Sequence, residues 1–202
     1  MKSCNLYFIR HGKTKANQLS KYCGSTDLSL SDIGISELKE LKKVCNYPKG
    51  DIYFTTAMKR TNETMEIIYP NVKYSIIEGF REYNFGIFEM KSYEELKLNE
   101  SYLSWINDDT GEVLCPGGES KKEYKKRIKD TFNDISKDIL SKGIENAVFI
   151  CHGGTIGTIL ELFYDDSKNF YMWQPRCGEG YKMVITYSEK VNIIDVERIF
   201  EV

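Results

Sequence analysis

His11 and His152 are the only histidines in the chain, and both stand where a ligand could reach them. Each follows an apolar segment with strand character and each precedes a glycine. A glycine at that position has no Cβ, so a ligand can approach the backbone closely. A helix that starts after such a turn offers free N–H groups to an anion. Two copies of this arrangement favour a shared anion site over two ordinary structural histidines.

The residues around His11 are suited to phosphate. A neutral imidazole can attack phosphorus with one ring nitrogen when an acceptor holds the other nitrogen. Arg10 supplies a planar set of donors that matches phosphate oxygens. Thr14 and Asn17 add neutral donors on the following turn. Arg10 by itself would be interpreted as a surface ion-pairing residue, and its position beside His11 favours the phosphate site instead.

Apolar patterns predict the elements that must position these residues. Apolar runs predict strands at 5–9, 51–55, 72–77, 146–151, 181–187 and 191–199. Helical spacing predicts helices from Ser31 and at 60–68, 119–140 and 155–163. Strands that alternate with helices indicate an α/β fold, and we expect a three-layer α/β/α sandwich with a mostly parallel central sheet. Ligands bind at the carboxyl ends of such strands, where both histidines should lie.

We expect a single domain over 1–202 with a lid-like insertion at about 79–118. The insertion is less regular than its surroundings and is rich in aromatic and charged residues. Its aromatic residues could stack on a substrate or could belong to the core, as could one tryptophan nearer the C-terminus; the residues in question are Tyr83, Tyr93, Trp105 and Trp173.

The order of several short motifs resembles the histidine phosphatase superfamily, which contains the cofactor-dependent phosphoglycerate mutases and related phosphatases. The similarity is nearest to the α-ribazole and broad-range phosphatase branch and runs along nearly the whole chain. The matching motifs are Arg10-His11-Gly12 with Thr14 and Asn17, Gly24 with Asp27, 55–60 with Thr64, Phe80-Arg81-Glu82 with Glu89, 116–120, and His152-Gly153-Gly154.

The resemblance implies a role for each matching residue. His11 would be the nucleophile that becomes phosphorylated, and Glu82 would protonate the leaving group. Three further residues would grip the phosphoryl oxygens: Arg10, Arg60 and His152. Substrate-binding positions would be Gly12, Thr14, Asn17, Gly24 and Gly153. Fixed cationic donors are the main requirement for phosphoryl transfer, so no metal ion or other cofactor is expected.

Some residues have a plainer interpretation. Glu82 and Arg60, taken alone, would be exposed surface charges, and their candidacy depends on the resemblance. The 116–120 segment is expected to be a turn followed by a helix cap, with Glu119 and Ser120 at the helix start. Departures from the usual family pattern leave the inner residues intact and concern substrate specificity; they are Lys13, Ser29, Thr56, Ala57, Met90 and Gly157.

The composition excludes some classes of function. Lys plus Arg total 28 against 30 for Asp plus Glu, a balance that argues against a nucleic-acid binder. The six cysteines form no CxxC pair, and two histidines are too few for a metal set. The apolar run at 6–9 is too short for a signal core or a membrane span. We therefore expect a cytoplasmic protein with reduced thiols, with no membrane or nucleic-acid partner, as a monomer or homodimer.

The expected activity is hydrolysis of a small phosphorylated metabolite, which would make the protein a phosphoric monoester hydrolase. Mutases of the resembling family usually carry a longer insertion and a tail that shields the phosphohistidine from water. This chain is short and ends soon after a predicted strand, which favours an open pocket and hydrolysis. A phosphoglycerate mutase-type phosphotransferase is the alternative, and a non-catalytic phosphate-binding or phosphoprotein-interacting protein is a third possibility.

Overall fold

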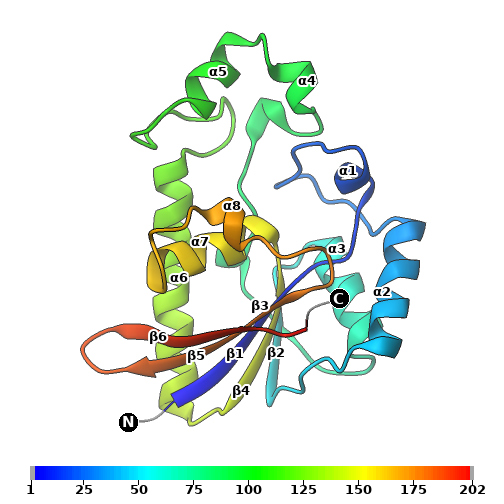
Figure 1. The fold of residues 1–202 in the computed structure, drawn as a ribbon, viewed down its shortest axis with the longest axis vertical. Coiled ribbons are helices and arrows are strands. Elements are labelled where there is room, and N and C mark those ends of the chain that lie inside the picture. Colours follow the sequence, from blue (N-terminus) through cyan, green and yellow to red (C-terminus); the bar gives the residue numbers. More distant parts are fainter. Residues whose placement is uncertain (1–2, 201–202) are drawn as a thin grey trace.

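A six-stranded sheet forms the centre of the computed structural model, which describes residues 3–200 (Figure 1). The strands are β1 (Ser3–Arg10), β2 (Ile52–Thr55), β3 (Ser75–Ile76), β4 (Asn146–Cys151), β5 (Gly180–Tyr187) and β6 (Val191–Arg198). Their order in the sheet is β3-β2-β4-β1-β5-β6. The pairs among β3, β2, β4 and β1 are parallel, whereas β5 and β6 join antiparallel at one side. The predicted mostly parallel α/β fold is confirmed.

Helices cover both faces of this sheet, because the buried strands are apolar on both sides. The larger helices are α2 (Asp32–Val44), α3 (Lys59–Ile68), α6 (Lys121–Lys142) and α7 (Gly153–Phe163). Phe8 and Phe149 face one core with α6 and α7. Ile9 and Ile150 face the second core with α2 and α3. The alternation along β1 and β4 therefore sends neighbouring side chains into two separate cores.

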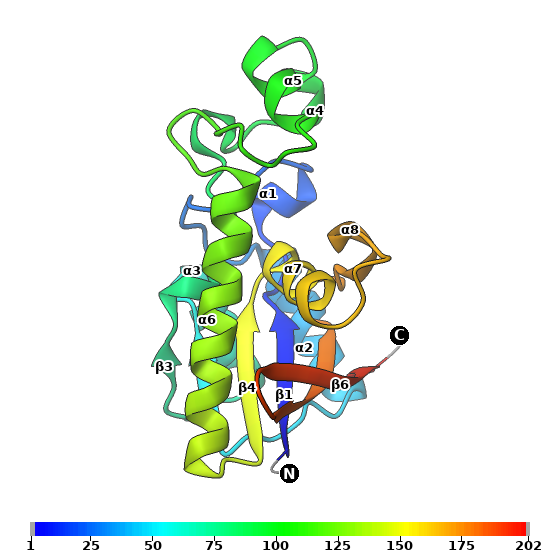
Figure 2. The same ribbon diagram turned by 90° about the vertical axis from the view of Figure 1, so that its left-hand side faces the viewer.

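Helix α6 follows clear sequence signals at both of its ends. Ser120 caps its start in a capping box with Glu123, and Gly143 ends it in the left-handed conformation at φ +70°. Its buried residues include Tyr124, Ile128, Phe132 and Ile139, which lie along one side of the helix. Figure 2 shows this long helix standing beside the sheet, with α4 (Tyr93–Leu96) and α5 (Glu100–Ile106) beyond its N-terminal end.

Residues 78–118 contain short helices that the sequence did not indicate. They are the 3₁₀ turns η1 (Glu78–Phe80) and η2 (Gly86–Phe88), and the helices α4 (Tyr93–Leu96) and α5 (Glu100–Ile106). The two α-helices project above the carboxyl end of the sheet, on the same side as α1 (Lys15–Gln18) (Figure 1).

Two predictions of secondary structure were incomplete. The strand expected at 72–77 is reduced to the two residues of β3, which lies at the sheet edge and pairs with β2 alone. The four-residue helices α1 and α8 (Phe170–Trp173) were not predicted, because four residues are too few for apolar periodicity to show. The other strands and helices agree with their expected positions to within a few residues.

Candidate active site

The two histidines lie side by side because β1 and β4 are parallel neighbours in matching register. Arg10 pairs with Cys151 at the end of the two strands, so His11 and His152 are the next residues on each. The His11 backbone N–H donates to the Cys151 carbonyl at 2.9 Å, and the two imidazole centroids are 5.3 Å apart. Both side chains are buried. The structure thus brings together two residues that are 141 positions apart in the chain.

Within residues 3–200, one nitrogen of the His11 ring has a hydrogen-bond partner and the other has none. Its Nδ1 lies 2.7 Å from the Gly12 carbonyl oxygen, which can only accept, so Nδ1 carries the proton. Burial, followed by the charges of Arg60 and Arg10, holds the pKa of His11 well below 6.5. The imidazole is therefore neutral at neutral pH, with an unprotonated Nε2. That is the state a nucleophilic histidine requires.

The His152 ring, in contrast, has a protein partner at each nitrogen. The Arg60 Nε–H lies 3.4 Å from Nδ1, and Thr56 Oγ1 lies 2.9 Å from Nε2. A guanidinium only donates, so Nδ1 accepts and Nε2–H donates to Thr56. Burial, followed by the charges of Arg60, His11 and Arg10, lowers the pKa of His152 well below 6.5. His152 is therefore also neutral, in the opposite tautomer to His11.

Arg10 and Arg60 bring two positive charges to His11 without a carboxylate partner. In the described part of the chain, carboxylates lie within 4.0 Å of Arg81, Arg127 and Arg198, but not of these two. Arg10 donates from Nη1 to the Pro175 carbonyl at 2.9 Å, and its buried Nε has no hydrogen-bond partner among the described residues. Arg60 is fully buried. Uncompensated buried charge of this kind favours binding of an anion.

Backbone carbonyls from the 24–26 loop fix the Arg60 guanidinium. Its Nη2 donates to the Gly24 carbonyl at 2.7 Å and its Nη1 to the Thr26 carbonyl at 2.9 Å. The Glu89 carboxylate holds this loop from the other side by accepting the backbone N–H groups of Gly24, Ser25 and Thr26. A Cβ at Gly24 would lie 1.6 Å from the Tyr83 carbonyl oxygen, so only glycine fits there.

The Glu82 carboxylate lies at the start of α7, the helix that begins directly after His152. Its Oε2 accepts the Gly154 N–H at 2.9 Å. Its Oε1 accepts the Tyr83 N–H and the Tyr124 hydroxyl, each at 2.9 Å. A Cβ at Gly154 would lie 2.3 Å from Oε1, so the glycine makes room for the carboxylate. Glu82 is thus a half-buried group of the site and not the exposed surface charge of the plainer interpretation.

The other predicted site residues differ in how far their hydrogen-bond donors are already used within the protein. The Gly12 N–H is already bonded to Thr64 Oγ1 at 2.9 Å. Thr14 and Asn17 bond to each other in a capping box, which leaves the Asn17 amide nitrogen outside the pair. A Cβ at Gly153 would lie 2.9 Å from Arg10 Cζ, so the guanidinium packs on this glycine.

Sequence reasoning assigned no role to four residues that hold the site in place: Thr56, Glu89, Tyr124 and Arg127. Thr56 was noticed only as a departure from the family pattern and Glu89 only as part of a motif, while Tyr124 and Arg127 lie on one side of the long helix. Glu119 was expected at the helix start, but its carboxylate bonds Arg127 at 2.6 Å and the Asn84 N–H at 2.8 Å, while Ser120 and Glu123 form the cap of the helix. The available sequence signal for this ion pair was the spacing of eight residues between the acidic Glu119 and the basic Arg127 across the start of the helix.

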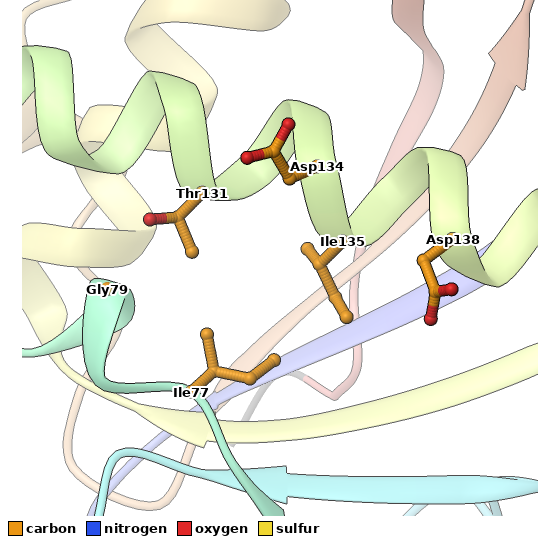
Figure 3. Close-up of a pocket in the computed structure, with 6 residues that line it drawn as sticks. All are labelled: Ile77, Gly79, Thr131, Asp134, Ile135 and Asp138. Carbon is orange, nitrogen blue, oxygen red and sulfur yellow. The ribbon is translucent and has the colours of Figure 1, made fainter.

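Most of the aromatic residues considered for substrate stacking belong to the core. Tyr83, Trp105 and Trp173 are buried, and the Trp105 Nε1–H donates to the Tyr83 hydroxyl at 2.8 Å. Tyr93 is exposed. An open pocket of about 360 Å³ lies apart from the histidines, between α6 and the segment that precedes Phe80 (Figure 3). Asp134 and Asp138 on its wall would repel a phosphate, so it does not compete as the anion site.

Residues 3–200 contain no group of three or more His, Cys, Asp and Glu side chains placed to hold a metal ion. The same residues include no helix that is both long enough and apolar enough to span a bilayer.

Comparisons with known proteins agree with this geometry. The chain is 23% identical over 189 residues to the adenosylcobalamin/alpha-ribazole phosphatase of Escherichia coli K12, covering 92% of this chain and 91% of that protein. It is 27% identical over 177 residues to a phosphoglycerate mutase of Schizosaccharomyces pombe, covering 77% of each. The crystal structure of the alpha-ribazole phosphatase from Shigella flexneri superimposes with a TM-score of 0.77 at 21% identity, covering 94% of each chain.

The order of the motifs, the fold and the relatives lead to the same family, whose members are phosphatases or mutases. A sequence model of the histidine phosphatase superfamily (branch 1) matches residues 6–195, and the chain belongs to this superfamily.

Proposed function

We propose that the protein is a metal-independent phosphatase that hydrolyses a small phosphate monoester through a phosphohistidine on His11. The observation that carries the proposal is that, in the part of the chain that the structure describes, a neutral His11 has a free Nε2 beside two guanidinium groups without carboxylate partners. A phosphoryl group in transfer spreads its charge over three equatorial oxygens, and fixed cations stabilise that charge. The chain supplies these cations itself.

In the proposed reaction, Arg10 and Arg60 bind the phosphoryl oxygens. His152 holds the Arg60 Nε and would add its own Nε2–H if this donor turned from Thr56 to the bound group. The Asn17 amide nitrogen would lie along the ester. Glu82 would protonate the leaving oxygen and then accept a proton from the water that attacks the phosphohistidine.

A trapping experiment tests the nucleophile. The protein is mixed with a ³²P-labelled monoester, quenched in alkali, which preserves phosphohistidine, and digested. Label is expected in the peptide that holds residue 11 and should be absent from His11→Ala. Robust turnover without label at this peptide would overturn the proposal.

Because one relative is a mutase, phosphoryl transfer between two positions of a substrate is the alternative activity. Steady release of inorganic phosphate without added bisphosphoglycerate favours hydrolysis, whereas dependence on that compound favours the mutase. Insensitivity to EDTA and inhibition by vanadate, a mimic of pentacoordinate phosphorus, are expected of either activity and separate both from a metalloenzyme or a non-catalytic phosphate-binding protein.

The leaving-group dependence tests Glu82. Glu82→Gln keeps the shape of the side chain but cannot donate the proton. We expect it to slow hydrolysis of alkyl phosphates by about 10²-fold or more and to leave p-nitrophenyl phosphate much less affected, since that leaving group departs without a proton. An equal loss on both substrates would assign the acid to another residue.

A further inference from the structure

We infer that the proton handled by Glu82 resides on its Oε2, and that Tyr124 and the Glu119–Arg127 pair are positioning residues that enforce this choice. The inference rests on the proposed function. It adds the atom that exchanges the proton and the residues on α6 that select it.

The two carboxylate oxygens of Glu82 differ in their hydrogen bonds. Each carboxylate oxygen has two lone pairs that can accept. Oε1 accepts two donors, the Tyr83 N–H and the Tyr124 hydroxyl, both at 2.9 Å. Within the described residues, Oε2 accepts one, the Gly154 N–H at 2.9 Å. The lone pair that remains for a proton is therefore on Oε2.

The Tyr124 hydroxyl donates to Oε1 at 2.9 Å, which is the shorter of its two contacts, and it lies 3.3 Å from Thr155 Oγ1. Tyr124 is buried, and its burial together with the nearby Glu82 carboxylate raises its pKa well above 10. It therefore keeps its proton throughout the pH range in which an enzyme works. The Arg127 guanidinium lies over the Tyr124 ring with 5.0 Å between its Cζ and the ring centroid, which fixes the ring as well.

Arg127 also holds the backbone that carries Glu82. Its Nη1 donates to the Gly79 and Arg81 carbonyls, each at 2.9 Å, and its Nη2 lies 3.3 Å from the Glu82 carbonyl. Glu119 orients the guanidinium by accepting from Nη2 at 2.6 Å and from Nε at 3.3 Å. The half-buried ion pair of Arg127 and Glu119 thus secures the segment that ends in Glu82, and its two charges balance each other.

The reaction balances through Oε2 alone. In the first step the His11 Nε2–P bond forms, the ester P–O bond breaks, and the proton on Oε2 passes to the leaving oxygen to give the alcohol. In the second step a water oxygen bonds to phosphorus and the N–P bond breaks. The proton of that water moves to Oε2, and inorganic phosphate departs. Oε1 stays bonded to Tyr124 throughout.

Tyr124→Phe tests the inference, because it frees a lone pair on Oε1 and leaves the ring in place. We expect its kcat on an alkyl phosphate such as glycerol 2-phosphate to fall about tenfold, a part of what a general acid contributes. On p-nitrophenyl phosphate we expect less than about a twofold change, because that substrate needs little acid assistance. Tyr69→Phe is the matched control, since its buried hydroxyl donates to the Pro48 carbonyl at 2.6 Å, away from the site.

Glu119→Gln is the second variant and removes the charge that orients Arg127 while keeping its shape. We expect the same split between the two substrates, smaller than for Tyr124→Phe. Equal losses on both substrates, the same split in Tyr69→Phe, or no change in Tyr124→Phe would overturn the inference. If wild-type protein hydrolyses both esters and labels His11, such a result overturns the inference alone. If wild type hydrolyses neither, the proposed function fails with it.

Discussion

The ends of β1 and β4 carry the same sequence pattern and yet place their histidines in different chemical states. Both strands end in a histidine followed by glycine, both rings are buried, and both have a lowered pKa. The Nδ1 of His11 bonds to the next carbonyl in its own chain segment, so Nε2 is left for chemistry. His152 instead bonds Arg60 and Thr56 from the β2–α3 region. The role of each histidine is set by its neighbours in space and not by its own motif.

Removal of the free nitrogen should have the largest effect. His11→Ala is expected to lower kcat by about 10⁴-fold or more, as removal of a nucleophile does in other covalent enzymes. The measurement is steady-state release of phosphate, with circular dichroism to show that the variant folds. Activity within about tenfold of wild type would erase the difference between the two histidines.

Removal of the second histidine should cost less. His152→Ala takes away a partner of Arg60 but leaves the nucleophile, so we expect a loss of about 10²- to 10³-fold, as for one donor of an oxyanion site. Phosphohistidine should still form on His11, more slowly, in a rapid-quench experiment. A variant that forms no phosphoenzyme at all would make His152 the equal of His11 and contradict the comparison.

Thr56→Val should have a smaller effect through the tautomer of His152. The variant leaves the buried Nε2–H without an acceptor, and such a loss costs about 1–3 kcal/mol. We expect a drop in kcat/KM of about tenfold and a lower Tm. Thr186→Val, a buried threonine on β5, is the control and should change kcat/KM by less than about twofold. Equal values for the two variants would remove Thr56 from the site.

The protonation states of the two histidines can be compared directly in the unaltered protein. With two histidines in the chain, ¹⁵N NMR gives two sets of imidazole signals. We expect His11 with its proton on Nδ1 and His152 with its proton on Nε2, both still neutral at pH 5.5, where an exposed histidine is about nine-tenths charged. Identical tautomers, or titration of either ring near pH 6.5, would contradict the structure.

The same lowered pKa values set how stability depends on pH. The unfolded chain takes up protons on both histidines near pH 6.5, while the folded chain does not, so the unfolded state binds more protons below that pH. Stability should therefore be full above pH 6.5 and fall as the pH drops, by about 1 kcal/mol per pH unit for each histidine. Urea unfolding at pH 7.5 and 5.5 measures the slope. A double variant His11→Asn, His152→Asn should flatten it.

Much of the fold and the centre of the site could be predicted from the sequence, because both depend on local patterns. The apolar runs of β1 and β4 predicted that the two histidines lie together at the carboxyl end of the sheet. The resemblance supplied Arg60 and Glu82. The supporting residues could not be found in this way. Tyr124 acts through a contact with a segment 42 positions away, and nothing in its own surroundings distinguishes it from a core tyrosine. Glu89 was noticed as part of a matching motif, but its contact with a loop 65 positions away could not be seen in the sequence.

The helices of four residues escaped prediction for a related reason. In α1 the Thr14–Asn17 capping box is a local signal, but no apolar stripe follows to extend it. In α8 the chain packs onto α7 because Gly157 has no side chain, and a Cβ there would lie 2.4 Å from the Phe170 carbonyl. That contact joins residues from separate helices, so its cause lies outside the sequence of α8.

The two arginines without carboxylate partners also have a consequence for the stability of the whole protein. Two like charges near His11 repel each other in the folded chain and are relieved when an anion sits between them. An anion that binds only the folded form raises the free energy of unfolding by RT ln(1 + [L]/Kd), about 2.7 kcal/mol at a hundredfold excess over Kd. Orthophosphate or vanadate should therefore raise Tm, and at equal concentration the tighter ligand should raise it more, so a heating curve can rank product and inhibitor mimics without any assay of turnover.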